Sequence, residues 1–357
     1  MSLFTQAPRI AVIFGGHSSE YEISLKSAYS VLTHMNREKY EAVAIGITRE
    51  GEWFHFRGPY QKILEDSWQN PEDCIPAIIS PDRRTNGILV FGEGATRKIS
   101  IDAAMPMLHG RNGEDGTIQG LLELAGITII GCNTLSSALC MDKSVAHKLV
   151  SLAGIKVPKS LVLQNEADFS AATSFAEEVG FPLFVKPVNG GSSFGITRVE
   201  TCEELPKAIK LAFEHDNSII IEENIEGFEV GCAILGRDEL FVGEVDEIEL
   251  LGGFLGCDEK NTLSTTTIHA PARIAADKAH EIKEIAKVIY RALGCSGFAR
   301  VDMFLTPAGE IVFNEVNTIP GFMPHSRYPN MLKAAGMTLE GIVGGIIEAA
   351  MPRRNAG

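Results

Sequence analysis

The sequence predicts a mixed α/β and α+β protein with several domains, and three observations support this. Its 357 residues suit two to three domains of roughly 150 residues each. The first third combines apolar runs with a glycine turn and a helical pattern, and the last third contains two alternating strands followed by a helical segment. A hydrophobic fraction of 45% and a charged fraction of 22% are those of a folded globular chain.

The first third is predicted to be a parallel α/β domain. The apolar run 10–14 ends in two glycines, and Ser19 and Glu22 have the spacing of a capping box that opens a helix. Further apolar runs at 41–48 and 103–108 are predicted strands.

The middle third follows a predicted hinge at 131–133. A helical pattern covers 136–152, and a predicted strand at 182–187 leads into a glycine- and serine-rich turn at 189–195. We expect a smaller α+β domain here.

The last third contains predicted strands at 218–223 and 229–235 and a long polar loop at 250–264. An amphipathic helix follows, with one apolar face made of Ile282, Ile285, Ile289 and Leu293. A hairpin and a terminal helix are predicted to close the domain.

The net charge argues against two classes of partner. The 32 Lys and Arg residues against 46 Asp and Glu residues give a formal charge of -14, which repels nucleic acid and anionic membrane surfaces. We therefore expect neither as a partner. A nucleotide such as ATP remains compatible, because a few lysines and backbone N–H groups can bind phosphate locally.

The cysteines and apolar runs indicate the compartment. Seven scattered cysteines, with no C-x-x-C pair, argue against a disulfide framework or structural zinc. The run at 10–14 is too short for a signal peptide, and no apolar stretch is long enough to span a membrane. We expect a cytoplasmic protein.

The predicted hairpin has a register that can be worked out. Strands at 298–305 and 311–317 flank a turn, and a loop of four residues at 307–310 would pair Thr306 with Ile311. This register sets Asp302 opposite Glu315 and Arg300 opposite Asn317, and the period-two alternation places all four on one face.

These four side chains suit phosphoryl transfer. Mg²⁺ binds carboxylate oxygens together with substrate phosphates, and an adjacent guanidinium stabilises transferring charge. The alternative is a solvated polar face on an edge hairpin with incidental ion pairs.

A second group of residues suits ATP. Lys186 ends a predicted strand just before the turn 189–195, and Lys143 lies some 40 residues earlier. Glu222 and Glu229 flank a turn and could accept hydrogen bonds from adenine or ribose. The alternatives are an ordinary turn and two solvated carboxylates. No Walker or G-x-G-x-x-G pattern is present at these turns.

Six sequence blocks in this order resemble the D-alanine–D-alanine ligase family of ATP-grasp enzymes over essentially the whole chain. They are GGHSSEYEISL from Gly15, LHGRNGEDGTIQG from Leu108, SALCMDK ending at Lys143, FVKPVNGGSSFG from Phe184, GFARVDMF from Gly297 and NEVNTIPGF from Asn314. The resemblance implies a three-domain ATP-grasp fold and a homodimer. Its domains would be a Rossmann-like substrate-binding domain at 1–132, a central lid domain at 133–224 and a catalytic domain at 225–357.

The resemblance also implies roles for individual residues. The residues implied for ATP are Lys143, Lys186, Ser193, Glu222, Glu229 and Lys260. Two Mg²⁺ ions, with Mn²⁺ as an alternative, would bind Asp302, Glu315 and Asn317. The catalytic group would be Glu20, which orients the first D-alanine, Ser192, which supports Glu20, and Arg300 with the Gly321 N–H, which stabilise the tetrahedral intermediate. The remaining substrate contacts would be His109, Ser326 and Arg327.

The implied activity is peptide-bond formation for peptidoglycan precursor synthesis. ATP converts the carboxylate of D-alanine into an acyl phosphate, which the amine of a second D-amino acid attacks. The loop 250–264 is the candidate lid that excludes water from the acyl phosphate.

Three departures from the family pattern concern the second substrate. Lys260 is followed by Asn261, where D-alanine-adding enzymes carry a tyrosine. Arg327 follows Ser326, as in vancomycin-resistance ligases, and adds a donor fork near an incoming hydroxyl or carboxylate. Met323-Pro324 replaces the usual Thr-Ser.

Other stretches, such as IGITREGEW from Ile45 and EVGCAILG from Glu229, look like the G-type resistance enzymes that make D-alanyl-D-serine. D-serine is therefore the expected second substrate. A housekeeping D-alanine–D-alanine ligase, or another ATP-grasp carboxylate–amine ligase, is the alternative.

Overall fold

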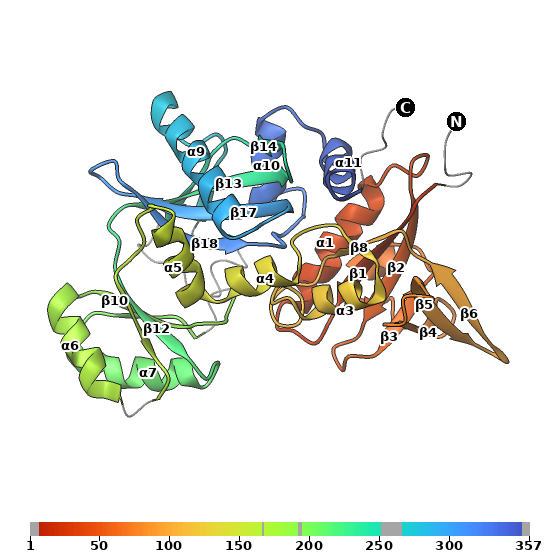
Figure 1. The fold of residues 1–357 in the computed structure, drawn as a ribbon, viewed down its shortest axis with the longest axis horizontal. Coiled ribbons are helices and arrows are strands. Elements are labelled where there is room, and N and C mark those ends of the chain that lie inside the picture. The colour runs from red at the N-terminus through yellow and green to blue at the C-terminus, as the bar shows by residue number, and fades with distance from the viewer. Residues whose placement is uncertain (1–6, 166–167, 192–194, 251–265, 352–357) are drawn as a thin grey trace.

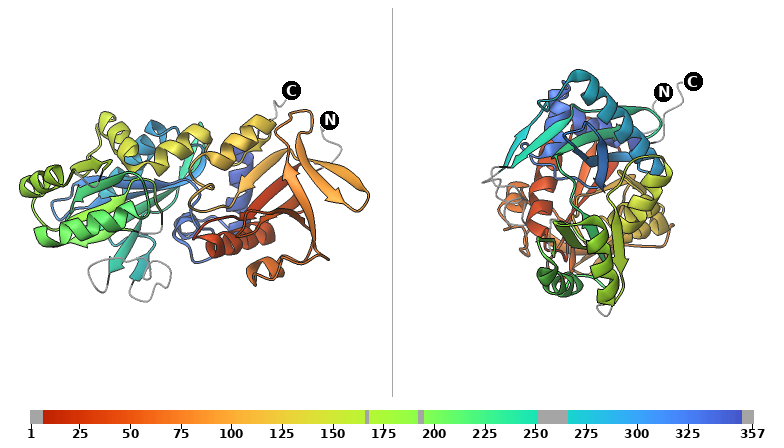
Figure 2. Two further views of the ribbon diagram at one scale, coloured as in Figure 1. Left: turned by 90° about the horizontal axis from the view of Figure 1, so that it is seen from below. Right: turned by 90° about the vertical axis from the view of Figure 1, so that its left-hand side faces the viewer.

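The computed structural model describes residues 7–165, 168–191, 195–250 and 266–351. It contains three β-sheets with helices packed around them. The first sheet lies at one end of an elongated molecule and the second at the other, with the third beside the junction between them (Figures 1 and 2). The predicted fold class is confirmed.

The first sheet has the strand order β6-β5-β4-β3-β2-β1-β7-β8. Its strands are β1 (Arg9–Gly15), β2 (Glu41–Ile47), β3 (Trp53–Phe56), β4 (Cys74–Ile79), β5 (Gly87–Gly92), β6 (Ala95–Ser100), β7 (Ala103–Pro106) and β8 (Thr128–Ile129). Strands β2, β1, β7 and β8 are parallel, but β2 through β6 form antiparallel pairs. The prediction of a purely parallel sheet was therefore wrong for 53–100. These strands are short and partly exposed, so they lack the continuous apolar run of a buried parallel strand.

Three helices accompany this sheet: α1 (Tyr21–His34), α2 (Gln61–Leu64) and α3 (Thr117–Ala125). The predicted capping box at the start of α1 is wrong. Glu20 occupies the N-cap position without a side-chain cap, and the Ser18 hydroxyl accepts the Glu20 N–H at 3.1 Å. The chain turns at Ser18, so the helix begins too late for Ser19 to cap it.

The predicted helical stretch 136–152 is two helices, α4 (Thr134–Met141) and α5 (Lys143–Leu152). Asp142 breaks it with an extended ψ of 100°, and its carboxylate accepts the Val145 N–H at 2.9 Å. Aspartate competes well for such a cap, which is why the run does not continue. The break places Lys143 in the first turn of α5.

The second sheet is antiparallel, with the order β11-β10-β12-β9. Its strands are β9 (Ser160–Leu163), β10 (Leu183–Pro187), β11 (Thr197–Val199) and β12 (Ile219–Glu223). The accompanying helices are α6 (Phe169–Val179), the short 3₁₀ helix η2 (Cys202–Glu204) and α7 (Leu205–Phe213). The strands predicted at 182–187 and 218–223 are confirmed.

The third sheet has the order β16-β15-β13-β17-β18, with β14 paired to β13. Its strands are β13 (Phe228–Gly236), β14 (Leu240–Val242), β15 (Asp246–Leu250), β16 (Thr266–His269), β17 (Gly297–Leu305) and β18 (Ile311–Asn317). The helices are α9 (Ala276–Ala292), α10 (Arg327–Ala334) and α11 (Leu339–Ala350). Helix α9 packs as predicted: Ile282, Ile289 and Leu293 are fully buried.

The first and third sheets share one hydrophobic core. Helix α11 lies beside α1, and Phe298 of β17 packs in the same cluster as the apolar face of α1 (Figure 1). This joint core holds the two sheets together at the site described below. Within the described part of the chain, every helix is too short or too polar to cross a membrane.

Candidate active site

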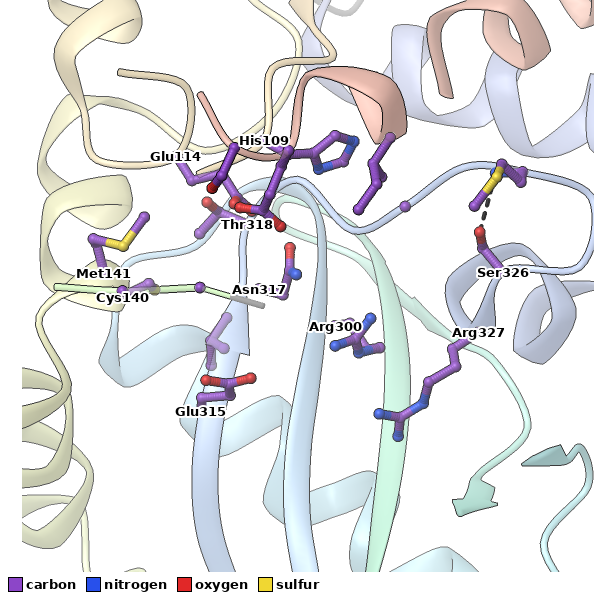
Figure 3. Close-up of a pocket in the computed structure, with 18 of the residues that line it drawn as sticks. His109, Glu114, Cys140, Met141, Arg300, Glu315, Asn317, Thr318, Ser326 and Arg327 are labelled. Carbon is purple, nitrogen blue, oxygen red and sulfur yellow. Dashed lines mark hydrogen bonds between the residues drawn. The ribbon is translucent and has the colours of Figure 1, made fainter. Parts of the chain in front are cut away.

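A cavity of about 510 Å³ lies where the start of α1, the loop after β7, the end of α4 and the third sheet meet (Figure 3). The predicted site residues that line it are Glu20, His109, Lys143, Arg300, Glu315, Asn317, Gly321, Ser326 and Arg327. Segments far apart in the sequence therefore supply a single site.

The hairpin β17–β18 delivers the predicted pairs. Asp302 is opposite Glu315 and Arg300 is opposite Asn317. The predicted loop was one residue too short, since Leu305 pairs with Ile311. A β-bulge at Asn314 then restores the register.

Arg300 and Asp302 form a buried ion pair. The Arg300 Nε and Nη2 atoms donate to both Asp302 oxygens at 2.7 to 2.9 Å, and Asp302 is 1% exposed. Burial opposes the charge on Arg300, but Asp302 holds the pKa of the guanidinium above its usual value. The alternative of a solvated polar face is thereby excluded for this strand.

Arg327 extends this pair into a larger charge cluster. Its Nε and Nη2 atoms donate to the two Asp246 oxygens at 2.8 Å, and Nη1 donates to Glu229 at 2.5 Å. Nη2 also lies 3.3 Å from Asp302. The donor fork expected to face a substrate is instead engaged by these carboxylates.

Lys143 lies in the same cavity, beside Glu315 of β18. Its Nζ donates to the Gly190 carbonyl at 2.5 Å and lies 3.9 Å from Glu315 Oε2. Its side chain is buried, so the lysine is held between the turn after β10 and the predicted metal ligands.

Lys186 and Glu222 form a second lysine–carboxylate pair. Lys186 Nζ donates to Glu222 Oε2 at 2.5 Å, and His147 Nε2 lies 3.9 Å from Oε1. Burial raises the pKa of Glu222, but Lys186 and His147 outweigh it and bring the pKa below its usual value. The Oε1 atom is buried and has no hydrogen-bond partner among the described residues. Such an atom is expected to accept a bond from a ligand.

Glu20 lies against the loop after β7. A Cβ added to Gly110 would come within 2.5 Å of Glu20 Oε2, and one added to Gly191 within 3.2 Å. With its φ of +69°, Gly110 is a position that needs glycine. Glu20 therefore lies between the loop after β7 and the turn after β10.

Glu114 was not predicted from the sequence as a site residue. The structure buries it beside Glu20. Its Oε2 accepts the Gly110 N–H at 2.7 Å, and Oε1 accepts the Ile319 N–H at 3.3 Å. Burial first, and then the charge of Glu20, raise the pKa of Glu114 to about 8. Glu114 belongs to the LHGRNGEDG block, so that block contained the signal.

His109 is buried in the same loop. Its Nε2 lies 3.1 Å from the Ser27 hydroxyl. Burial lowers the pKa of His109 to about 4, so the ring is neutral at pH 7.

Gly321 and Ser326 belong to the segment between β18 and α10. The Ser326 hydroxyl accepts the Met323 N–H at 3.1 Å and lies next to Gly321 (Figure 3). Accepting this bond leaves the Ser326 proton free to donate to a substrate.

Three of the predicted site residues, Ser192, Ser193 and Lys260, lie outside the described residues, as do Asn261 and nearly all of the candidate lid 250–264. Their roles stay predictions.

Three sheets around a cavity lined by Lys143, Arg300 and Glu315 are the arrangement of an ATP-grasp ligase. The family model described as "D-ala D-ala ligase N-terminus" matches residues 9–132. The model described as "D-ala D-ala ligase C-terminus" matches residues 149–348. The chain belongs to the D-alanine–D-alanine ligase family and is a ligase, as predicted. ATP use is consistent with this family.

Individual relatives agree with this placement. The vancomycin B-type resistance protein VanB of Enterococcus faecalis is 45% identical over 97% of this chain and 99% of its own. A D-alanine–D-alanine ligase of Caldicellulosiruptor bescii is 41% identical over 97% and 95%. The crystal structure of the VanG D-Ala:D-Ser ligase from Enterococcus faecalis superposes with a TM-score of 0.91 at 54% identity, covering 97% of this chain and 100% of that one.

Proposed function

We propose that this protein uses ATP to join D-alanine to D-serine. The observation that carries the ligase chemistry is the pocket in which Glu20, Arg300 and Glu315 converge, with Asp302 paired to Glu315 across the hairpin. The Arg327 side chain beside Ser326 supports D-serine, as does the similarity to a structure titled as a D-Ala:D-Ser ligase.

The donor set on the hairpin fits Mg²⁺. Asp302, Glu315 and Asn317 offer only oxygen ligands from two adjacent strands, which suits a hard cation. Among the described residues no cluster of three or more His, Cys, Asp or Glu side chains is arranged to hold a metal. Phosphate oxygens of ATP would therefore complete the coordination of two Mg²⁺ ions, or of Mn²⁺ in their place. The ions would offset the negative charge of the phosphates.

The lysine side of the pocket would bind ATP. Lys143 would exchange the Gly190 carbonyl, and Lys186 the Glu222 carboxylate, for phosphate oxygens of ATP. The unpartnered Glu222 Oε1 would accept a hydrogen bond from the adenine amino group. Glu229, whose Oε1 accepts from Arg327, would bind the ribose hydroxyls.

The other side would hold the amino acids. Glu20 would bind the ammonium group of D-alanine, while His109 lines the cavity as a neutral ring. Arg300 and the Gly321 N–H would stabilise the oxyanion that forms when the second amine attacks. Ser326 would donate its free proton to the carboxylate of the second substrate.

Arg327 would act on the second substrate indirectly, by holding Ser326 in place. Because its fork is bonded to Asp246 and Glu229, it fixes the start of α10 and with it the neighbouring Ser326. We propose that the pocket next to this fixed turn accepts the D-serine side chain. The proposal also includes the domain boundaries given above, a homodimer and a cytoplasmic location.

The test is phosphate release from ATP with Mg²⁺ present and absent, with dipeptides identified by mass spectrometry. The three mixtures are D-alanine alone, D-alanine with D-serine, and D-alanine with D-lactate. We expect Mg²⁺-dependent release and mostly D-alanyl-D-serine at equal concentrations. A dominant D-alanyl-D-alanine product would instead identify a housekeeping ligase, and no release in any mixture would refute the ligase assignment of these residues.

A further inference from the structure

Three buried side chains from the N-terminal part of the chain hold the segment that joins β18 to α10. This segment, 318–322, contains Gly321, whose N–H lies at the cavity. The side chains that hold it are Ser27 of α1, together with His109 and Glu114 of the loop after β7. His109 and Glu114 are labelled in Figure 3. None of the contacts is local in sequence.

Ser27 makes the contact nearest to Gly321. The Phe322 N–H, one residue beyond Gly321, donates to the Ser27 hydroxyl at 3.1 Å. Ser27 and Phe322 are both fully buried, so water cannot replace this acceptor. Without Ser27, a buried N–H would lose its partner.

His109 fixes the orientation of the Ser27 hydroxyl. A hydroxyl has one proton and two lone pairs, so Ser27 can donate to His109 Nε2, 3.1 Å away, while it accepts from Phe322. The Ser27 side chain is thus held from two sides.

Glu114 holds the other end of the segment. Its Oε1 accepts the Ile319 N–H at 3.3 Å, and Asn317 Oδ1 accepts the same N–H at 3.1 Å. The peptide groups on both sides of Gly321 are therefore bonded to side chains of the first sheet and its helix.

We propose that Ser27 is a positioning residue for ligation: through Phe322 it aims the Gly321 N–H at the oxyanion of the tetrahedral intermediate. This inference rests on the proposed function. Ser27 does not line the cavity and does not touch substrate. Its effect falls on the rate of the chemical step rather than on ATP binding. The Ser27 hydroxyl bonds to Phe322 and His109, whereas Lys143 and Lys186 contact Gly190, Glu315 and Glu222.

The chain offers a matched control on the same helix. Ser30 lies one turn after Ser27, is also buried, and its hydroxyl has no hydrogen-bond partner among the described residues. Ser30→Ala removes a buried hydroxyl without freeing a backbone N–H of the segment.

The test compares full-length wild type, Ser27→Ala and Ser30→Ala. Its readouts are kcat for dipeptide formation, KM for ATP, and hydrogen–deuterium exchange of the peptide that covers 318–326. We expect Ser27→Ala to lower kcat about tenfold, since the donor is displaced rather than removed. KM for ATP should stay within twofold, and exchange should rise in this peptide alone. Ser30→Ala should match the wild type in all three.

Two results would overturn the inference: a kcat within twofold of wild type in Ser27→Ala, or a loss of kcat without faster exchange at 318–326. If Ser27→Ala does not fold, Ser27→Cys replaces it, because a thiol fills the site but accepts the Phe322 N–H more weakly than a hydroxyl. A wild type that forms no dipeptide would refute the proposed function instead, so the two failures are distinct.

Discussion

The two cationic sides of the pocket are built differently. Lys143 and Lys186 each pair with one carboxylate, Glu315 and Glu222 respectively, through a single ammonium group. Arg300 and Arg327 share three carboxylates and bind two of them with forked contacts. The lysine contacts can be exchanged one at a time, whereas the arginine cluster must be broken as a unit.

This difference assigns different tasks to the two sides. A lysine ammonium is a flexible point charge, so it can turn from a carboxylate to a phosphate when the nucleotide arrives. A bidentate guanidinium in a buried cluster fixes the geometry of what surrounds it. We therefore expect loss of Glu315, beside Lys143, to abolish turnover, and changes at Arg327 and its partner Asp246 to affect stability and selectivity.

The largest expected effect belongs to Glu315 on the hairpin. Glu315→Ala removes one of the two carboxylates proposed to hold Mg²⁺ and should lower ATP turnover about a thousandfold or more, with the fold intact. Glu310→Ala, at the exposed tip of the same hairpin, is the control and should keep full turnover. Near-normal turnover in Glu315→Ala, measured by phosphate release, would remove the metal assignment.

The next effect concerns stability in the arginine cluster. Asp246 is fully buried and accepts both bonds of the Arg327 fork. Asp246→Ala leaves a buried guanidinium undercompensated and should lower the free energy of unfolding by about 3 kcal/mol. Urea denaturation measures this, with Glu244→Ala, which breaks a more exposed lysine pair, as the control. Equal losses in the two variants would contradict the distinction between the cluster and ordinary ion pairs.

The third effect is a pH dependence from His109. Its pKa in the folded protein is about 4, against 6.5 for an ordinary histidine, so between these values the unfolded chain binds more protons. Stability contributed by the neutral ring is therefore lost as pH falls from 6.5 to 4, by up to roughly 3 kcal/mol.

The measurement for His109 is urea denaturation of wild type and His109→Gln at pH 7 and pH 4.5. The comparison between the two proteins cancels the opposite contribution of Glu114, whose pKa is raised. The wild type should lose more stability on acidification than the variant. An identical pH response would show that His109 is not the group that titrates.

The smallest effect is on selectivity. Arg327→Leu frees the start of α10 and should shift the ratio of D-alanyl-D-serine to D-alanyl-D-alanine about tenfold toward the latter, which corresponds to about 1.4 kcal/mol. Mass spectrometry of products at equal substrate concentrations reports the ratio. Arg273→Leu, which removes a half-exposed arginine paired with Glu247 and Glu249 of β15, is the control. An unchanged ratio would remove Arg327 as the selector.

The sequence was most informative where spacing along one or two strands decides the geometry. The Asp302–Glu315 and Arg300–Asn317 pairs were predicted from period-two alternation and a four-residue loop, and they occur because the bulge at Asn314 offsets the extra loop residue. The buried face of α9 was equally predictable, because helical periodicity of apolar residues indicates which face is buried.

Long-range contacts could not be predicted in this way. Arg327 and Asp246 are 81 residues apart, and neither period nor composition shows that they meet. Glu114 was missed because a carboxylate in a polar loop is usually solvated, whereas here it is buried and accepts an N–H from Ile319, 205 residues away. The break at Asp142 was hidden by helix-forming residues on both sides.

The most direct test of the contrast between the two sides is a crystal structure with Mg²⁺ and a non-hydrolysable ATP analogue. The account predicts that Lys186 Nζ leaves Glu222, now at 2.5 Å, for a phosphate oxygen, while both Arg327–Asp246 bonds stay near 2.8 Å. A structure in which the Arg327–Asp246 pair opens while Lys186 remains bound to Glu222 would contradict it.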